Sequence, residues 1–134
     1  MPLITWSEKL SVDVKQCDEQ HKKLIGLIND LHAAMKAGKA SPILGDIFVS
    51  MVDYTKTHFI DEETLLQAHG YTDLSGQRKS HQQFIDDLDK HYQDFVTGRT
   101  VTISVMSFLQ KWLEHHIQVD DKKYGSFLNA KGIY

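Results

Sequence analysis

The sequence has very little cysteine and proline, and these shortages exclude several classes of protein. Cys17 is the only cysteine among 134 residues, so no intramolecular disulfide can form and a metal site built from several thiolates is excluded. Only two prolines occur, so little interrupts a helical pattern. With 41% apolar and 25% charged residues, the composition is globular, and the length favours one domain spanning residues 1–134.

Long apolar runs and concentrated positive charge are also missing. No run approaches the roughly 18 apolar residues of a membrane helix, and the first residues, MPLITWSEK, lack the basic and apolar regions of a signal peptide. Because a lone cysteine also suits a reducing compartment, we expect a cytoplasmic protein. The 15 lysines and arginines are scattered and the formal net charge is -3, so the sequence gives no footprint for binding nucleic acid.

Helical periodicity fills most of the chain. It predicts four long helices and a short apolar piece, over residues of about 19–37, 41–68, 73–97, 101–117 and 124–128. Because the links between the long helices are short, neighbouring helices should run antiparallel. We therefore predict an all-α fold: an up-down-up-down four-helix bundle with an N-terminal extended arm and a short C-terminal helix.

Turn and cap residues support these boundaries. Asp18 is a candidate N-cap for the first helix, and Gly38 is a candidate for the glycine that ends it. The pair Ser41–Pro42 is typical of a helix start. The first eighteen residues lack the helical period, and we expect them to form an arm that carries Trp6 onto the bundle.

Eight histidines are an unusual number for a chain of this size, and four of them interrupt apolar helical stripes. Each stripe contains at least one polar side chain where the period calls for an apolar one; these residues are His21, His58, Glu62, Gln77, His81 and His116. Counting along antiparallel helices, at about 1.5 Å per residue, places them at one depth in the bundle. Unrelated core histidines would not be expected to converge in this way.

The spacing within each helix suits shared metal coordination. His58 and Glu62 are four residues apart, so they share a helix face. His116 and Asp121 are five apart, so Asp121 reaches the same site only if the helix loosens after Ile117, through a π-bulge or a break.

The resulting donor set contains four imidazoles and two carboxylates, from His21, His58, Glu62, His81, His116 and Asp121. Such mixed ligands suit iron, manganese or zinc better than copper(I), and six are too many for one tetrahedral zinc. Two metal ions bridged by the carboxylates would use the set economically. The alternative is a metal-free bundle whose polar core residues pair with one another. The other histidines, His32, His69, His91 and His115, are expected at the surface or at helix ends.

Several motifs together resemble the bacteriohemerythrins over essentially the whole chain. They are ITW (4–6), DEQHKKL (18–24), HFIDEE (58–63), GYTDL (70–74), HQQF (81–84) and WLEHHIQVDDKKYG (112–125). The resemblance implies a protein that is not an enzyme and that binds O2 reversibly at two non-haem irons joined by an oxo or hydroxo bridge. It also implies that Glu62 and Asp121 bridge the irons, that His21 and His58 hold the iron that receives O2, and that His81 and His116 hold the other. Apolar residues within a turn of the ligands would form the wall of the O2 pocket or simply core: Leu24, Phe59, Trp112, Leu113 and Ile117.

The sequence departs from the family pattern at position 77. The family has a histidine four residues before His81, whereas this chain has Gln77. Gln77 could coordinate weakly through its amide oxygen, leave the position to water or a small anion, or hydrogen-bond to a bound water. The iron held by His81 and His116 would then be exchangeable, which would shorten the life of the oxygenated form.

Three functions are compatible with such a centre. The first is reversible O2 binding for carriage, storage or sensing. The second is an O2 or redox sensor domain that belongs to a larger signalling protein with a fused output domain. The third, a ferritin-like oxidase or peroxidase, is disfavoured because no Glu-x-x-His pair occurs in the sequence.

Overall fold

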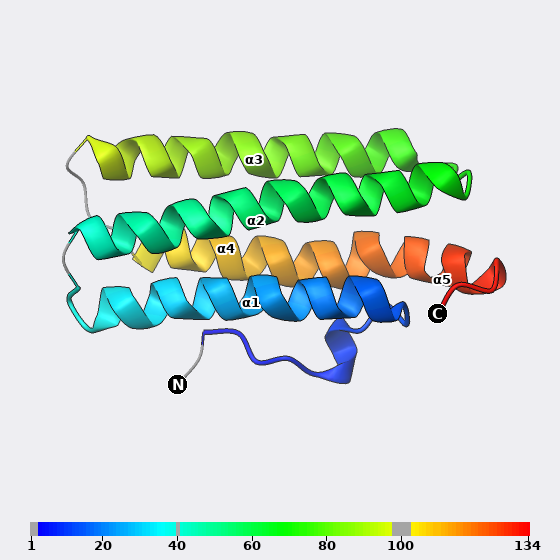
Figure 1. Cartoon of the computed structure of the whole chain (residues 1–134), viewed down its shortest axis with the longest axis horizontal. Coiled ribbons are helices and arrows are strands. Elements are labelled where there is room, and N and C mark those ends of the chain that lie inside the picture. Colours follow the sequence, from blue (N-terminus) through cyan, green and yellow to red (C-terminus); the bar gives the residue numbers. More distant parts are fainter. Residues whose placement is uncertain (1–2, 40, 98–102) are drawn as a thin grey trace.

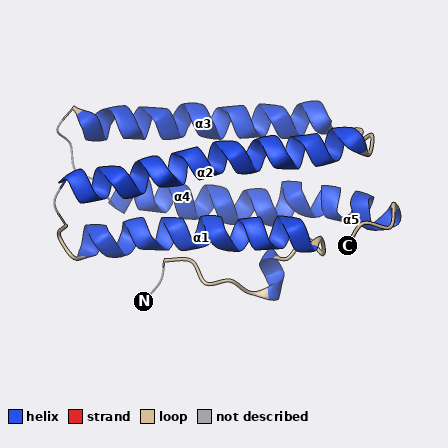
Figure 2. Ribbon diagram, viewed as in Figure 1, coloured by secondary structure: helices blue, strands red, loops and turns tan. Residues whose placement is uncertain are grey.

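The computed structural model describes residues 3–39, 41–97 and 103–134 and shows only helices as regular elements there (Figure 2). The predicted all-α class is confirmed. In chain order the elements are η1 (Glu8–Leu10), α1 (Lys15–Lys36), α2 (Ser41–Ala68), α3 (Leu74–Val96), α4 (Ile103–His115), the π-helical segment η2 (His116–Asp121) and α5 (Lys122–Ala130). The four long helices lie side by side and alternate in direction, as the up-down-up-down prediction requires (Figure 1).

The start of α1 differs from the prediction. The helix begins at Lys15, and Val14 occupies the N-cap position without a side-chain cap. Asp18 lies inside the first turn, where its carboxylate accepts hydrogen bonds from the Ser11 hydroxyl (2.6 Å) and the Val12 amide (2.8 Å). The predicted cap is wrong because this carboxylate holds the arm instead of the helix end.

The predicted glycine at the end of α1 is confirmed. Gly38 adopts φ +67°, and the amides of Gly38 and Lys39 donate to the carbonyls of Met35 and Ala34. This pair of bonds is a Schellman motif, which a residue with a Cβ adopts only with strain. Gly98 and Val101, which the sequence places at the last turn between long helices, lie outside the described residues.

The apolar stripes of the helices meet in one continuous core. Its fully buried members include Phe48, Leu31, Leu66, Leu88 and Leu109. Aromatic rings join α3 to α4: Phe84 stacks on Trp112 with centroids 3.8 Å apart. In the described part of the chain, no helix is both long and apolar enough to cross a membrane.

The N-terminal arm packs on the bundle through aliphatic side chains more than through Trp6. Ile4 and Val12 are almost fully buried, whereas the Trp6 ring is half-buried beneath the Lys22 ammonium, 5.1 Å away. The Asn29 side chain also exchanges two hydrogen bonds with the Ile4 backbone. The arm is therefore an ordered part of the fold along its described length.

Candidate metal centre

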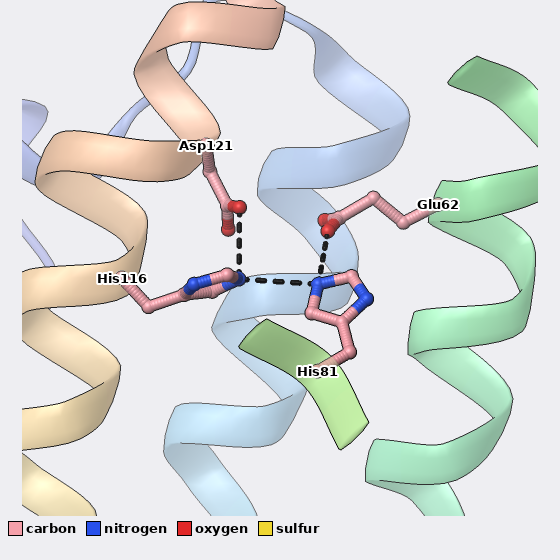
Figure 3. A group of neighbouring side chains, drawn as sticks. All are labelled: Glu62, His81, His116 and Asp121. Atoms are coloured by element: carbon pink, nitrogen blue, oxygen red, sulfur yellow. Dashed lines mark hydrogen bonds and ion pairs between the residues drawn. The ribbon is translucent and has the colours of Figure 1, made fainter. Parts of the chain in front are cut away.

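The polar residues that interrupt the stripes meet at one end of the bundle, where α1 begins, α2 ends and α3 begins. The helices α1, α2 and α3 and the segment η2 contribute to the cluster, and its members are all buried: His21, His58, Glu62, Gln77, His81, His116 and Asp121. Figure 3 shows the carboxylates of Glu62 and Asp121 above the imidazoles of His81 and His116. The structure thus brings together every residue that the sequence placed at this depth.

The π-helical segment explains how Asp121 joins the cluster. His116 begins η2 and Asp121 ends it, so one wide turn separates them. An α-helix would rotate Asp121 away from His116 over five residues, whereas the wider turn keeps both side chains facing inward. His116 Nε2 and Asp121 Oδ1 are 3.0 Å apart. The loosening predicted after Ile117 therefore occurs as a π turn rather than as a break.

Glu62 lies at the middle of the cluster and faces three imidazoles. Its Oε2 is 3.3 Å from His21 Nε2 and 3.2 Å from His58 Nε2, while its Oε1 is 3.0 Å from His81 Nε2. Two groups of potential ligands therefore share Glu62: one is completed by His21 and His58, and the other by His81, His116 and Asp121. A carboxylate in this position can join two metal ions.

Three of the four imidazoles are oriented by residues that the sequence analysis missed. The Nδ1 of His58 donates to Gln20 Oε1 (2.6 Å), and the Nδ1 of His81 donates to Glu63 Oε2 (2.8 Å). His116 Nδ1 similarly faces Asp120 Oδ2 at 3.0 Å. These acceptors direct Nε2 toward the centre, as in metal sites where an outer carboxylate orients a histidine ligand. All three stand next to a predicted ligand in the sequence, which is the signal that could have identified them.

Tyr124 also belongs to the cluster, although no sequence pattern indicated this. Its buried hydroxyl donates to Glu62 Oε2 over 2.7 Å. Burial and the nearby charges of Glu62 and Asp121 raise the pKa of Tyr124 well above its usual range, so the phenol stays protonated and donates. The buried thiol of Cys17 hydrogen-bonds to Tyr124, and burial raises the pKa of Cys17 to about 12.

Both central carboxylates are ionised. Burial opposes ionisation, but His58, His21 and His81 hold the pKa of Glu62 well below its usual range. Burial and the Glu62 charge oppose ionisation of Asp121, yet His116 and His21 lower its pKa. Burial likewise opposes protonation of His21, but Asp121 and Glu62 raise its pKa to about 10. The two carboxylates thus favour a proton on His21.

The residues fit a metal site, because some buried polar atoms lack a protein partner. His21 Nδ1 has no hydrogen bond in the described structure, and neither does Asp121 Oδ2, although His21 Nε2 lies 3.2 Å from this oxygen. His81 Nε2 and His116 Nε2 face each other at 3.1 Å. Inward-facing imidazole nitrogens and carboxylate oxygens are ligands that iron, manganese and zinc accept.

The predicted pocket residues are buried or half-buried, and two of them are aromatic rings that contact the cluster. Leu24, Leu113 and Ile117 are buried, as expected for a dry wall. Phe59 stacks on the His81 ring with centroids 3.8 Å apart, and the half-buried Trp112 stacks on His116 at 4.3 Å. The two aromatic rings therefore stack on the half of the cluster that contains His81 and His116.

Comparison with known proteins gives a consistent result. Residues 12–128 match the family described as the hemerythrin HHE cation binding domain. The chain is 32% identical to the bacteriohemerythrin of Methylococcus capsulatus, covering 97% of this chain and 100% of that protein. It is 33% identical to a bacteriohemerythrin of Pseudomonas aeruginosa, covering 92% and 80% of the two chains. A crystal structure of wild-type hemerythrin superimposes with a TM-score of 0.87 at 29% identity, covering 92% of this chain and 96% of that one.

Proposed function

The chain belongs to the hemerythrin family, and from that premise we propose that it binds O2 reversibly at two iron ions without turning it over. The observation that carries the proposal is the buried cluster in which Glu62 is shared by two groups of potential ligands. Residues 1–134 would form one such domain. His21 and His58 would hold one iron, His81 and His116 would hold the other, and Glu62 and Asp121 would bridge them.

The bound irons, with their oxo or hydroxo bridge, would supply the reversible electron transfer on which O2 binding depends. The protein's own contribution is to orient the ligands and to keep the site dry. Gln20, Glu63 and Asp120 orient three imidazoles, and buried Leu24, Leu113 and Ile117 keep bulk water out. Exclusion of water favours release of intact O2 over side reactions.

The protons of the cluster are also part of the proposed function. In the metal-free chain, protonated imidazoles such as His21 balance Glu62 and Asp121. Metal ions would take over this balancing role, because a histidine ligand coordinates only as the neutral imidazole. Metal loading should therefore release protons, and acid should oppose loading.

Metal analysis and O2 titration test the proposal directly. Protein loaded anaerobically with ferrous iron should contain about two irons per chain, and its visible absorption should change in air and revert under argon. His116→Ala should lower the iron content, whereas His115→Ala should not, because His115 is the exposed neighbour of a buried ligand. One zinc per chain, or an irreversible spectral change, would contradict the proposal.

A further inference from the structure

Gln77 occupies the space between the two carboxylates that would bridge the metals. Its amide nitrogen donates to Asp121 Oδ1 over 2.6 Å and to Glu62 Oε1 over 3.2 Å, and it lies 3.4 Å from His81 Nε2. The side chain is 4% exposed, so water does not compete strongly for these bonds. The amide group thus joins the two carboxylates.

This orientation is incompatible with a cation at the same place. The two amide hydrogens carry partial positive charge, and they point at the oxygens that would bind the metal. The hydrogen bonds from Gln77 to the two carboxylates both run through its amide nitrogen. A half-turn about the last side-chain torsion exchanges the nitrogen and oxygen positions and would present a lone pair to the metal.

The structure has room for such a turn. A small polar cavity of about 100 Å³ adjoins Gln77, and Gly76, Ser80, Asp73 and Asp120 also line it. A Cβ at Gly76 would collide with the Asp73 carboxylate, so the glycine allows this carboxylate to fold over the helix. The amide nitrogen and oxygen of Gln77 can therefore exchange positions without repacking the apolar core.

We propose that the amide oxygen of Gln77 is a ligand of the metal held by His81 and His116. This ligand makes the site prefer divalent cations that favour oxygen ligands. In the structure the same side chain bridges the carboxylates through its nitrogen. A carbonyl oxygen suits Mn²⁺ better than an imidazole does, whereas imidazole suits Zn²⁺. The inference rests on the proposed metal centre but not on O2 binding.

The test measures binding of Mn²⁺ and of Zn²⁺ separately to the metal-free protein by titration calorimetry. Gln77→Leu should weaken one of the two Mn²⁺ equivalents by roughly 10-fold to 100-fold, the range found when an interaction supporting a metal is removed. Gln77→His should shift the preference of that equivalent toward Zn²⁺. Gln83→Leu, an exposed glutamine on the same helix, should change neither equivalent.

A spectroscopic measurement separates coordination from a purely structural role. In ¹³C-labelled protein, the side-chain carbonyl carbon of Gln77 should change its chemical shift when diamagnetic Zn²⁺ binds, because the amide oxygen then donates to the metal. An unchanged carbonyl-carbon shift, or an unchanged second Mn²⁺ equivalent in Gln77→Leu, would overturn the inference and show that water or another small ligand fills the position. Intact metal titrations combined with a failure to bind O2 would instead contradict only the proposed function.

Discussion

At the residue scale, the cluster depends on donors and acceptors that are not themselves candidate ligands. Glu62 is charged and almost fully buried, so every hydrogen bond that it accepts offsets part of its desolvation. Tyr124 of α5 supplies one such bond. The same tyrosine also contacts the Cys17 thiol, which lies near the other end of the sequence. The carboxylate is thereby held in one orientation.

Tyr124→Phe should destabilise the metal-free protein. The substitution keeps the ring but removes the donor to Glu62, and loss of a hydrogen bond to a buried charge costs about 1–3 kcal/mol. The free energy of unfolding, measured in urea, checks this. Tyr92→Phe is the control, since the half-buried Tyr92 ring packs against Phe48 and Phe95. Equal losses in the two variants would argue against a specific role for the Tyr124 hydroxyl.

Cys17 should react slowly with alkylating reagents in the folded protein. Burial raises its pKa from 9.0 to about 12, which at pH 8 lowers the thiolate fraction roughly 1,000-fold, in addition to the steric protection of the core. Because the folded pKa is raised, the stability that this group contributes is complete below pH 9 and is lost as the pH rises toward 12. Alkylation rates in buffer and in urea test the effect; similar rates would mean that the thiol is accessible.

At the scale of elements, α5 follows η2 directly and lies between the N-terminal arm and the candidate metal centre, to which it contributes Tyr124. Residues His116–Asp121 lead directly into α5, and α5 packs its Gly125 against the backbone of Val12. The arm therefore contacts α5, and α5 in turn contacts the cluster through Tyr124. A substitution at the contact between Gly125 and Val12 should therefore also disturb the cluster.

Gly125→Ala should destabilise the protein by about 1–3 kcal/mol, because the added Cβ would overlap the Val12 carbonyl oxygen and displace the arm. Gly26→Ala, in the interior of α1, has open space around the new Cβ and should instead stabilise by up to about 1 kcal/mol. Thermal unfolding of the two variants, with limited proteolysis of the arm, compares them. If Gly125→Ala were as stable as Gly26→Ala, the arm would not be held at this contact.

At the scale of the whole molecule, the candidate metal centre places polar side chains in one layer of the bundle interior. Four imidazoles, two carboxylates and one amide occupy a layer of the bundle that would otherwise be hydrophobic core. Coordination to a bound metal would offset the free energy that burying these polar groups costs.

Removing metal should therefore lower the thermal midpoint substantially. A ligand that binds only the folded state stabilises by about 4 kcal/mol at 1,000 times its Kd, and for a chain of this size that corresponds to roughly 10 °C or more. Calorimetric scans of iron-loaded and chelator-treated protein check the shift, and the chelated protein with iron restored serves as the control. An unchanged midpoint would show that the cluster does not bind metal tightly.

The sequence by itself determined the helical architecture and the residues that share one depth. Helical periodicity and the positive φ of Gly38 depend on a few neighbouring residues, so they can be predicted without knowing the fold. The spacing of His58 and Glu62, and their level with His21 across an antiparallel link, follow from the same local geometry. Their role as ligands stays a prediction.

Only the tertiary structure decided the features that depend on contacts between distant segments. Asp18 could cap α1 or bind the arm, and the position of Ser11 and Val12 selects the arm. Asp121 faces His116 because η2 adopts a π turn, one of two ways in which the helix could have loosened. Gln77 donates to Glu62 and Asp121, which are 15 and 44 residues away in the chain. Hydrogen bonds across such separations depend on how helices are packed, and local sequence patterns carry no information about that packing.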